Sequence, residues 1–131
     1  MIEIYTDGSV KKRNPKDSRG KGKYTWATFV DGVFMGRCIL SEDNAAVNEM
    51  EMKAIKTAME TIQPDIRDVD VVIYTDSNNA VNWINGEFQC NAPNIKDILE
   101  GIINIQGRFF KRNMTVDVVK IARERNKAHV E

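Results

Sequence analysis

The segment that most constrains the fold is the run VDVVIYT at residues 69–75, which is apolar almost without interruption. A strand with one face in water alternates apolar and polar residues, whereas a strand covered on both faces has no need to alternate. The run is far shorter than the roughly 20 residues of a transmembrane helix. We therefore expect a central strand that has other strands on both sides and helices on its faces.

Further strands are indicated on both sides of this run. Residues 1–7 alternate as a first strand and are followed by a long loop over 10–23, rich in Gly, Lys and Arg. Two β-rich segments, 23–32 and 33–40, meet at an Asp-Gly pair, which is a strong hairpin signal. Residues 114–121 read as a last strand, and the polar tail after them is left unplaced apart from a possible short helix.

Three helices are predicted between these strands. A helical period covers 43–62, with Asp43 or Asn44 as its N-cap and Pro64 as its end. Residues 77–86 suggest a short helix stopped by a glycine. Asn91 can cap a third helix, whose buried side we expect to consist of Ile95, Ile98, Leu99, Ile102 and Ile103.

The predicted order is β-β-β-α-β-α-α-β, which favours an α/β fold with a mixed five-stranded sheet flanked by helices. The length of 131 residues fits a single domain over 1–131. No leader or membrane-length apolar run is visible, so we expect a cytoplasmic monomer that does not contact membranes. Cys38 and Cys90 lack metal-type spacing, which favours reduced thiols.

Charge is unevenly distributed although the formal net charge is zero. Residues 11–23 contain seven Lys or Arg and one Asp, and residues 108–131 contain seven Lys or Arg and three acids. Basic segments beside an acidic body are typical of a protein that binds a polyanion. On charge alone, solvated basic loops explain the pattern equally well.

The sequence Ile-Tyr-Thr-Asp occurs twice, at residues 4–7 and 73–76. Each copy ends a predicted strand with an aspartate, Asp7 or Asp76. In open α/β sheets, sites form in the crevice beyond the carboxyl ends of the central strands. A single copy is most simply explained by an aspartate that starts a turn, but the repeated context favours two acids that act together.

A third carboxylate interrupts the apolar side of the helix over 43–62. Glu51 lies in line with Val47, Ile55 and Met59, which are spaced four residues apart, whereas the other charged residues of this helix belong to its outer face. An uncompensated glutamate on a core-facing stripe costs several kcal/mol. A lysine partner, a cation shared with the two aspartates, or a position at the exposed rim of the helix could each avoid that cost.

Three carboxylates in one crevice would repel one another unless a cation compensates them. Mg²⁺ prefers a few carboxylates together with water and phosphate oxygens. Two such ions about 4 Å apart can activate water and stabilise the leaving oxygen of a phosphodiester. The three acids therefore predict a site for divalent cations at Asp7, Glu51 and Asp76.

These residues resemble the motifs of type 1 ribonuclease H. YTDGS at 5–9, NEMEMKA at 48–54 and TDSNNAV at 75–81 are similar to the family's three acidic motifs, in the same order and at the same spacing. The resemblance implies that two Mg²⁺ or Mn²⁺ ions bind Asp7, Glu51 and Asp76. It also implies cleavage of the RNA strand of an RNA–DNA hybrid, with 3′-hydroxyl and 5′-phosphate products.

The resemblance implies substrate contacts as well. Asn48 and Asn78 stand where the family has amide side chains that meet the hybrid, and such groups can recognise the 2′-hydroxyl of RNA. Gly8 and Ser9 are expected beside the scissile phosphate. For each of these four residues, a plain turn or cap role is the alternative interpretation.

The sequence departs from the family pattern most clearly at the fourth acid. The family has an Asn…Ala-Asp motif near its C-terminus, whereas this chain reads RNKAHVE. His129 is the favoured substitute, because an imidazole can bind a metal or transfer a proton. Glu131, an exposed tail histidine without a role, or a motif beyond residue 131 are the alternatives.

Two other functions are compatible with parts of this pattern. The incomplete tail motif allows a hybrid-binding module that has lost its chemistry. A phosphoacceptor signalling domain also places acids at strand ends, but it needs an acidic pair after the first strand, and this chain offers only Asp7 there.

Overall fold

The structure is a computed structural model that describes residues 1–129. Its five strands are β1 (Ile2–Lys11), β2 (Gly20–Val30), β3 (Val33–Ala45), β4 (Val71–Thr75) and β5 (Val116–Lys120). Its helices are α1 (Val47–Glu60), α2 (Asn78–Ile84) and α3 (Pro93–Lys111), followed by the 3₁₀ turn η1 (Arg123–Arg125). The predicted order of strands and helices is confirmed. Among the described residues, no helix combines the length and the hydropathy that crossing a bilayer requires.

The sheet has the order β3-β2-β1-β4-β5. The β1, β2 and β3 strands pair antiparallel, whereas β1 with β4 and β4 with β5 pair parallel, so the sheet is mixed. The apolar run of residues 69–75 forms the internal strand β4, as predicted. The hairpin between β2 and β3 turns at Asp31 and Gly32. Both residues have positive φ, as the two central residues of a type I′ turn require.

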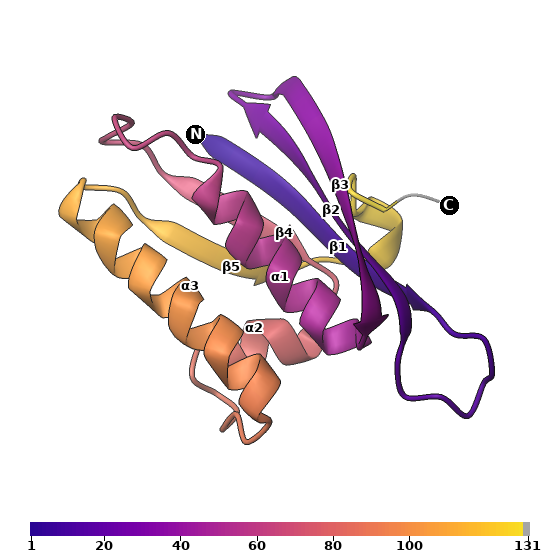
Figure 1. Ribbon diagram of the computed structural model, residues 1–131. Coiled ribbons are helices and arrows are strands. Elements are labelled where there is room, and N and C mark those ends of the chain that lie inside the picture. Colours follow the sequence, from indigo (N-terminus) through magenta and orange to yellow (C-terminus); the bar gives the residue numbers. More distant parts are fainter. Residues whose placement is uncertain (130–131) are drawn as a thin grey trace.

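The sheet separates two layers of unequal thickness. The three α-helices lie on one face of the sheet, and the C-terminal tail with η1 passes over the other face (Figure 1). The core lies between the sheet and the helices, where several side chains are fully buried: Ile4, Met50, Met52, Ile55, Met59, Ile73 and Ile102. The tail is anchored by hydrogen bonds from Thr25 Oγ1 to the carbonyl of Ala128 and from Arg37 to the carbonyl of Lys127.

The first three strands are longer than the sequence suggests. β1 and β2 pair as far as Lys11 and Lys21, so the predicted loop over 10–23 shrinks to a turn over 12–19. Pairing of β1 with β4 ends at Tyr5 and Tyr74. Asp7 is therefore inside β1 rather than at its end, at the step where the sheet narrows from five strands to three.

Two predicted helix caps are wrong. Asp43 and Asn44 belong to β3, and α1 begins after Ala46. The backbone amide of Ala46 donates a hydrogen bond to the side chain of Glu49. Pairing with β2 extends β3 to Ala45 and so outweighs the capping preference of those residues. α1 also ends at Glu60, before Pro64, and α3 is preceded by Ala92 rather than capped by Asn91.

The predicted buried sides of two helices need smaller corrections. Met52 is fully buried although it lies outside the expected stripe, and Val47 is exposed. In α3, Ile105 and Phe109 replace Ile103, which is exposed, on the buried side.

Candidate metal centre and nucleic-acid site

Asp7, Glu51 and Asp76 meet at the step in the sheet. One carboxylate oxygen of each lies within 4.8 Å of those of the other two. β1 supplies Asp7, the second turn of α1 supplies Glu51, and Asp76 directly follows the last residue of β4. The structure thus brings together the three acids that the sequence predicts to act together.

The approach of α1 to β1 depends on a glycine. A Cβ at Gly8 would overlap the backbone of Met50 and Glu51, so any other residue would force helix and strand apart. This contact places the second turn of α1 directly over the strand that carries Asp7. The expected importance of Gly8 therefore has a steric basis in the packing of α1 on β1.

Glu51 is the most perturbed of the three acids. Only 6% of its surface is exposed, and its Oε2 atom has no hydrogen-bond partner among the described residues. Burial, followed by the charges of Asp7 and Asp76, raises the pKa of Glu51 to about 9, against smaller opposing effects of Gly8 and Thr75. A buried oxygen without a partner is energetically expensive, which makes Glu51 Oε2 a candidate ligand for a cation.

Asp76 is shifted in the same direction. Burial and the charge of Asp7 raise the pKa of its carboxyl, while a hydrogen bond from Asn126 and the nearby Arg123 and His129 oppose the shift. Two adjacent acids thus have raised pKa values, which marks the cluster as a candidate functional site.

The C-terminal tail brings His129 to the cluster. Its Nδ1 lies 3.1 Å from Asp7 Oδ2. Asn126 holds the tail in place, because its buried side chain donates to the carbonyl of Thr6 at 2.9 Å and accepts from the amide of Ala128 at 3.1 Å. The predicted proximity of His129 to the acids is therefore seen, whereas Glu131 lies outside the described residues.

The acids open onto a cleft of about 670 Å³ that residues from β1, α1 and the segment after β5 complete. Its lining includes Gly8 and Ser9 as predicted, and also two cations that sequence reasoning missed, Lys120 and Arg123. Nothing in their local sequence distinguishes them from other basic residues. Asn126 was also missed, although the Asn…Ala pattern at 126–128 is the signal that could have revealed it.

The two predicted amide groups lie at helix starts. Asn48 is the second residue of α1 and half-buried, and Asn78 is the first residue of α2 and exposed. Neither is among the residues that line the cleft, so their side chains are not brought to the acids directly.

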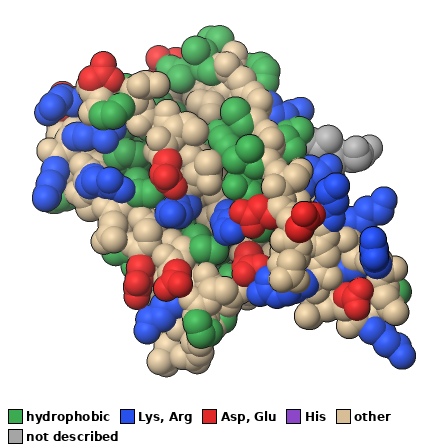
Figure 2. Space-filling view, viewed as in Figure 1, with side chains coloured by type: hydrophobic (Ala, Val, Ile, Leu, Met, Phe, Trp, Pro, Cys, Tyr) green, Lys and Arg blue, Asp and Glu red, His purple; other side chains and the backbone are tan. Residues whose placement is uncertain are grey.

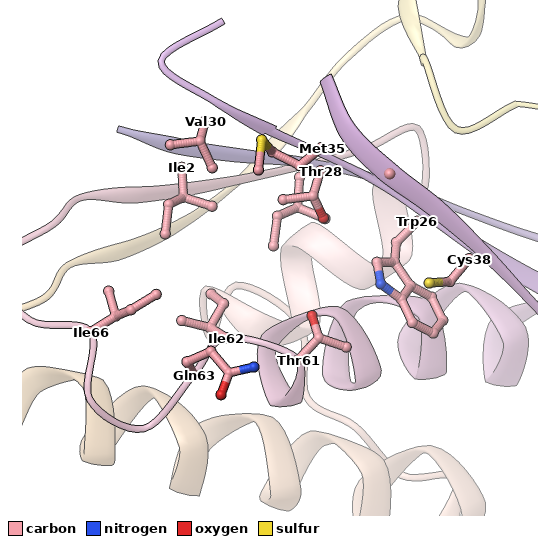
Figure 3. A pocket seen from close by; sticks show the side chains of 12 residues that line it. Ile2, Trp26, Thr28, Val30, Met35, Cys38, Thr61, Ile62, Gln63 and Ile66 are labelled. Carbon is pink, nitrogen blue, oxygen red and sulfur yellow. The ribbon is translucent and has the colours of Figure 1, made fainter. Parts of the chain in front are cut away.

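A second hollow, at the opposite end of β1 and α1, has a different chemistry. Its lining includes Ile2, Trp26, Val30, Met35 and Ile62 and contains no charged side chain (Figure 3). It contains no carboxylate to bind a hard metal ion and no cationic side chain to bind a phosphate. The acidic cleft is therefore the candidate functional site.

Solved structures of similar shape include several ribonucleases H. RNase H1 from the halophilic archaeon Halobacterium salinarum is 18% identical with a TM-score of 0.82, and the match covers 97% of this chain and 89% of that one. LC11-RNase H1 in complex with an RNA/DNA hybrid is 21% identical with a TM-score of 0.85 and the same coverage. The N-terminal RNase H domain of a Mycobacterium tuberculosis protein is 15% identical with a TM-score of 0.77, covering 95% and 84%.

Of the two sequence comparisons, the one with family models gives a match. A search of curated proteins finds no match. The RNase H family model matches residues 1–128, which include the three acids and Asn126. The chain belongs to the RNase H family.

Proposed function

We propose that this protein is a divalent-metal-dependent endonuclease that hydrolyses the RNA strand of RNA–DNA hybrids, leaving 3′-hydroxyl and 5′-phosphate ends. Membership of the RNase H family supports the reaction class. The structural similarity to LC11-RNase H1, solved with an RNA/DNA hybrid, supports the substrate class.

The observation that carries the proposal is the unpartnered Oε2 of Glu51 inside a group of three converging carboxylates. The donor set consists only of carboxylate oxygens, which suits hard cations such as Mg²⁺ or Mn²⁺. Binding such ions would offset the burial and the mutual repulsion that raise the pKa of Glu51 and of Asp76. The residues present therefore fit the proposed ions.

In this proposal Asp7, Glu51 and Asp76 hold two Mg²⁺ or Mn²⁺ ions. When bound, a pair of such ions supplies a water nucleophile at neutral pH and stabilises charge on the leaving oxygen. Lys120 and Arg123, which line the cleft, attract the phosphate backbone. His129 presents Nδ1 to Asp7, which leaves Nε2 as the ring nitrogen free to accept or donate a proton.

Substrate recognition is assigned to four residues near the acids. Gly8 and Ser9 line the cleft where the scissile phosphate would lie. Asn48 and Asn78 lie outside the lining of the cleft, at the starts of α1 and α2, and their amide groups would recognise the 2′-hydroxyl that distinguishes RNA from DNA.

The test is a gel assay with end-labelled RNA–DNA hybrid, duplex DNA and duplex RNA over a series of Mg²⁺ and Mn²⁺ concentrations. We expect metal-dependent cutting of the hybrid alone, and Asp7→Asn should reduce it to the metal-free background because the variant loses one charged ligand. Asp65→Asn, at an exposed position away from the cleft, is the matched control. Full cleavage by Asp7→Asn would refute the proposal.

A second candidate function follows from the tail. An imidazole, His129, stands beside Asp7 where the family pattern noted above has a carboxylate. A chain with an impaired centre would act as a hybrid-binding module. Tight hybrid binding without turnover at every metal concentration would favour this function over the nuclease.

A further inference from the structure

A second polar hollow continues from the acidic cleft along the β1–β2 hairpin. It has a volume of about 520 Å³, and it shares Ser9 and Val10 with the cleft. The remaining lining residues are Lys11, Lys21, Gly22, Lys23 and Ser41. The hollow therefore joins the candidate centre to the most basic segment of the chain.

The strand register places its polar side chains on one face of the sheet. Ser9 pairs with Lys23, and Lys23 pairs with Ser41, so these three form a row across β1, β2 and β3. Lys11 pairs with Lys21 and forms the next row. A Cβ at Gly22 would meet Ala45 and Met50, so residue 22 faces α1, and its neighbours Lys21 and Lys23 must face the opposite side.

The two rows are aligned with the candidate centre. Asp7 pairs with Thr25 in the preceding row of the same face. Rows on one face of a strand are about 7 Å apart, and one strand of a duplex carries a phosphate about every 3.4 Å along the axis. The rows thus lie about two and four nucleotides from the position of Asp7.

The lysines are free to bind an anion. All three are exposed, and none of them forms an ion pair with a carboxylate of residues 1–129. Glu42, the nearest acid along β3, is paired with Lys53. The basic turn beside these rows is visible at the lower right of the molecule (Figure 2).

The hairpin is also held in place relative to the cleft. Arg19 forms two hydrogen bonds with Glu49 in the first turn of α1, at 2.7 and 3.2 Å, and one with the carbonyl of Asn44 at 2.8 Å. Glu49 additionally accepts from Asn94 in α3 at 2.7 Å. Arg19, at the end of the turn between β1 and β2, therefore ties the hairpin to α1 and, through Glu49, to α3, which restrains the lysine rows relative to the acids.

We propose that Lys11, Lys21 and Lys23, with Ser9 and Ser41, form an anion track that binds backbone phosphates of the hybrid about two to four nucleotides from the cut. The inference rests on the proposed function. It adds a substrate contact on only one side of the scissile phosphate, the side towards the turn between β1 and β2. The track binds without reading sequence, since contacts to backbone phosphate oxygens carry no sequence information.

The test measures hybrid binding in an Asp76→Asn background, which prevents turnover under the proposed function. The track variant carries Lys11→Gln, Lys21→Gln and Lys23→Gln. A control with the same change in charge carries Arg67→Gln, Arg108→Gln and Lys111→Gln, exposed positions at the other end of the molecule. Affinity is measured by fluorescence anisotropy between 50 and 200 mM salt.

Each lost phosphate contact lowers the slope of log affinity against log salt by about 0.9. The slope of the track variant should therefore be smaller in magnitude by up to about 2.7. Between 50 and 200 mM salt, its affinity should then fall by a factor about 40-fold smaller than that of the parent. The control variant should keep the slope of the parent. The difference should vanish with hybrids truncated to one base pair from the cut on one side, and persist with hybrids that extend six.

Equal slopes for track and control variants, with hybrid binding intact, would overturn the track and leave the proposed function standing. An effect that persists after truncation on either side would also overturn it. Absence of hybrid binding in the parent itself would overturn the proposed function, and the track with it.

Discussion

Substituting Glu51 by Gln should change how the stability of the metal-free protein depends on pH. The carboxyl of Glu51 has a pKa of about 9 in the folded state and an ordinary value of 4.5 in the unfolded chain. Between these values the folded protein binds a proton that the unfolded chain does not. Stability from this group is complete below pH 4.5 and falls as the pH rises towards 9.

The size of the effect follows from linkage. One bound proton corresponds to about 1.4 kcal/mol per pH unit, so between pH 6 and pH 8 the free energy of unfolding should fall by roughly 3 kcal/mol through this group. Glu51→Gln keeps the shape of the side chain but cannot titrate, so this component should disappear. The raised pKa of Asp76 contributes a dependence of the same sign, and Glu51→Gln leaves that contribution in place.

The assay is urea unfolding in the presence of EDTA at several pH values from 5.5 to 8.5. Glu60→Gln is the matched control, because Glu60 is on the same helix but exposed. The wild type and Glu60→Gln should lose stability in parallel as the pH rises, while Glu51→Gln stays nearly level. Identical slopes in all three proteins would show that Glu51 is ionised in the metal-free state and would refute the reasoning.

Three further substitutions test the packing and the tail. Gly8→Ala should lower the free energy of unfolding by about 1–3 kcal/mol, because its Cβ overlaps the backbone of Met50; an unchanged Tm would contradict this. Asn126→Ala leaves two buried backbone groups without partners and should cost about 1–3 kcal/mol for each in urea unfolding, unlike a change in the exposed tail. His129→Asp should strengthen Mn²⁺ binding in calorimetry, since it adds a carboxylate beside Asp7, and weaker binding would count against a ligand at this position.

The features that sequence predicts correctly are those that depend on local period. The uninterrupted apolar run of β4 predicts an internal strand, and the four-residue spacing around Glu51 predicts a carboxylate on the buried side of α1. Because the hydrophobic effect acts on whole faces, such patterns survive the details of packing. From these two features the sequence predicts that Glu51 and Asp76 lie in one site.

The wrong predictions concern element boundaries that are determined by strand pairing between segments distant in the sequence. Asp43 and Asn44 have the chemistry of helix caps, yet β2 recruits the segment around them into β3 as far as Ala45. Lys11 and Lys21 read as loop residues, but they pair because the hairpin continues past the end of β4. The local sequence of a strand does not determine where its pairing ends, because the end of the pairing also depends on the length of the partner strand.

Because Asp7 lies inside a paired strand and Asp76 lies just past the end of one, the backbone is restrained unequally around the three acids. The backbone of Asp7 is fixed by the β1–β2 ladder on both sides of it, and Glu51 is fixed by its helix. Asp76 lies outside the ladder, and His129 lies on a tail segment. In the proposed centre, adjustment to cations of different radius would therefore fall mainly to Asp76, while Asp7 and Glu51 would keep a constant position relative to the substrate.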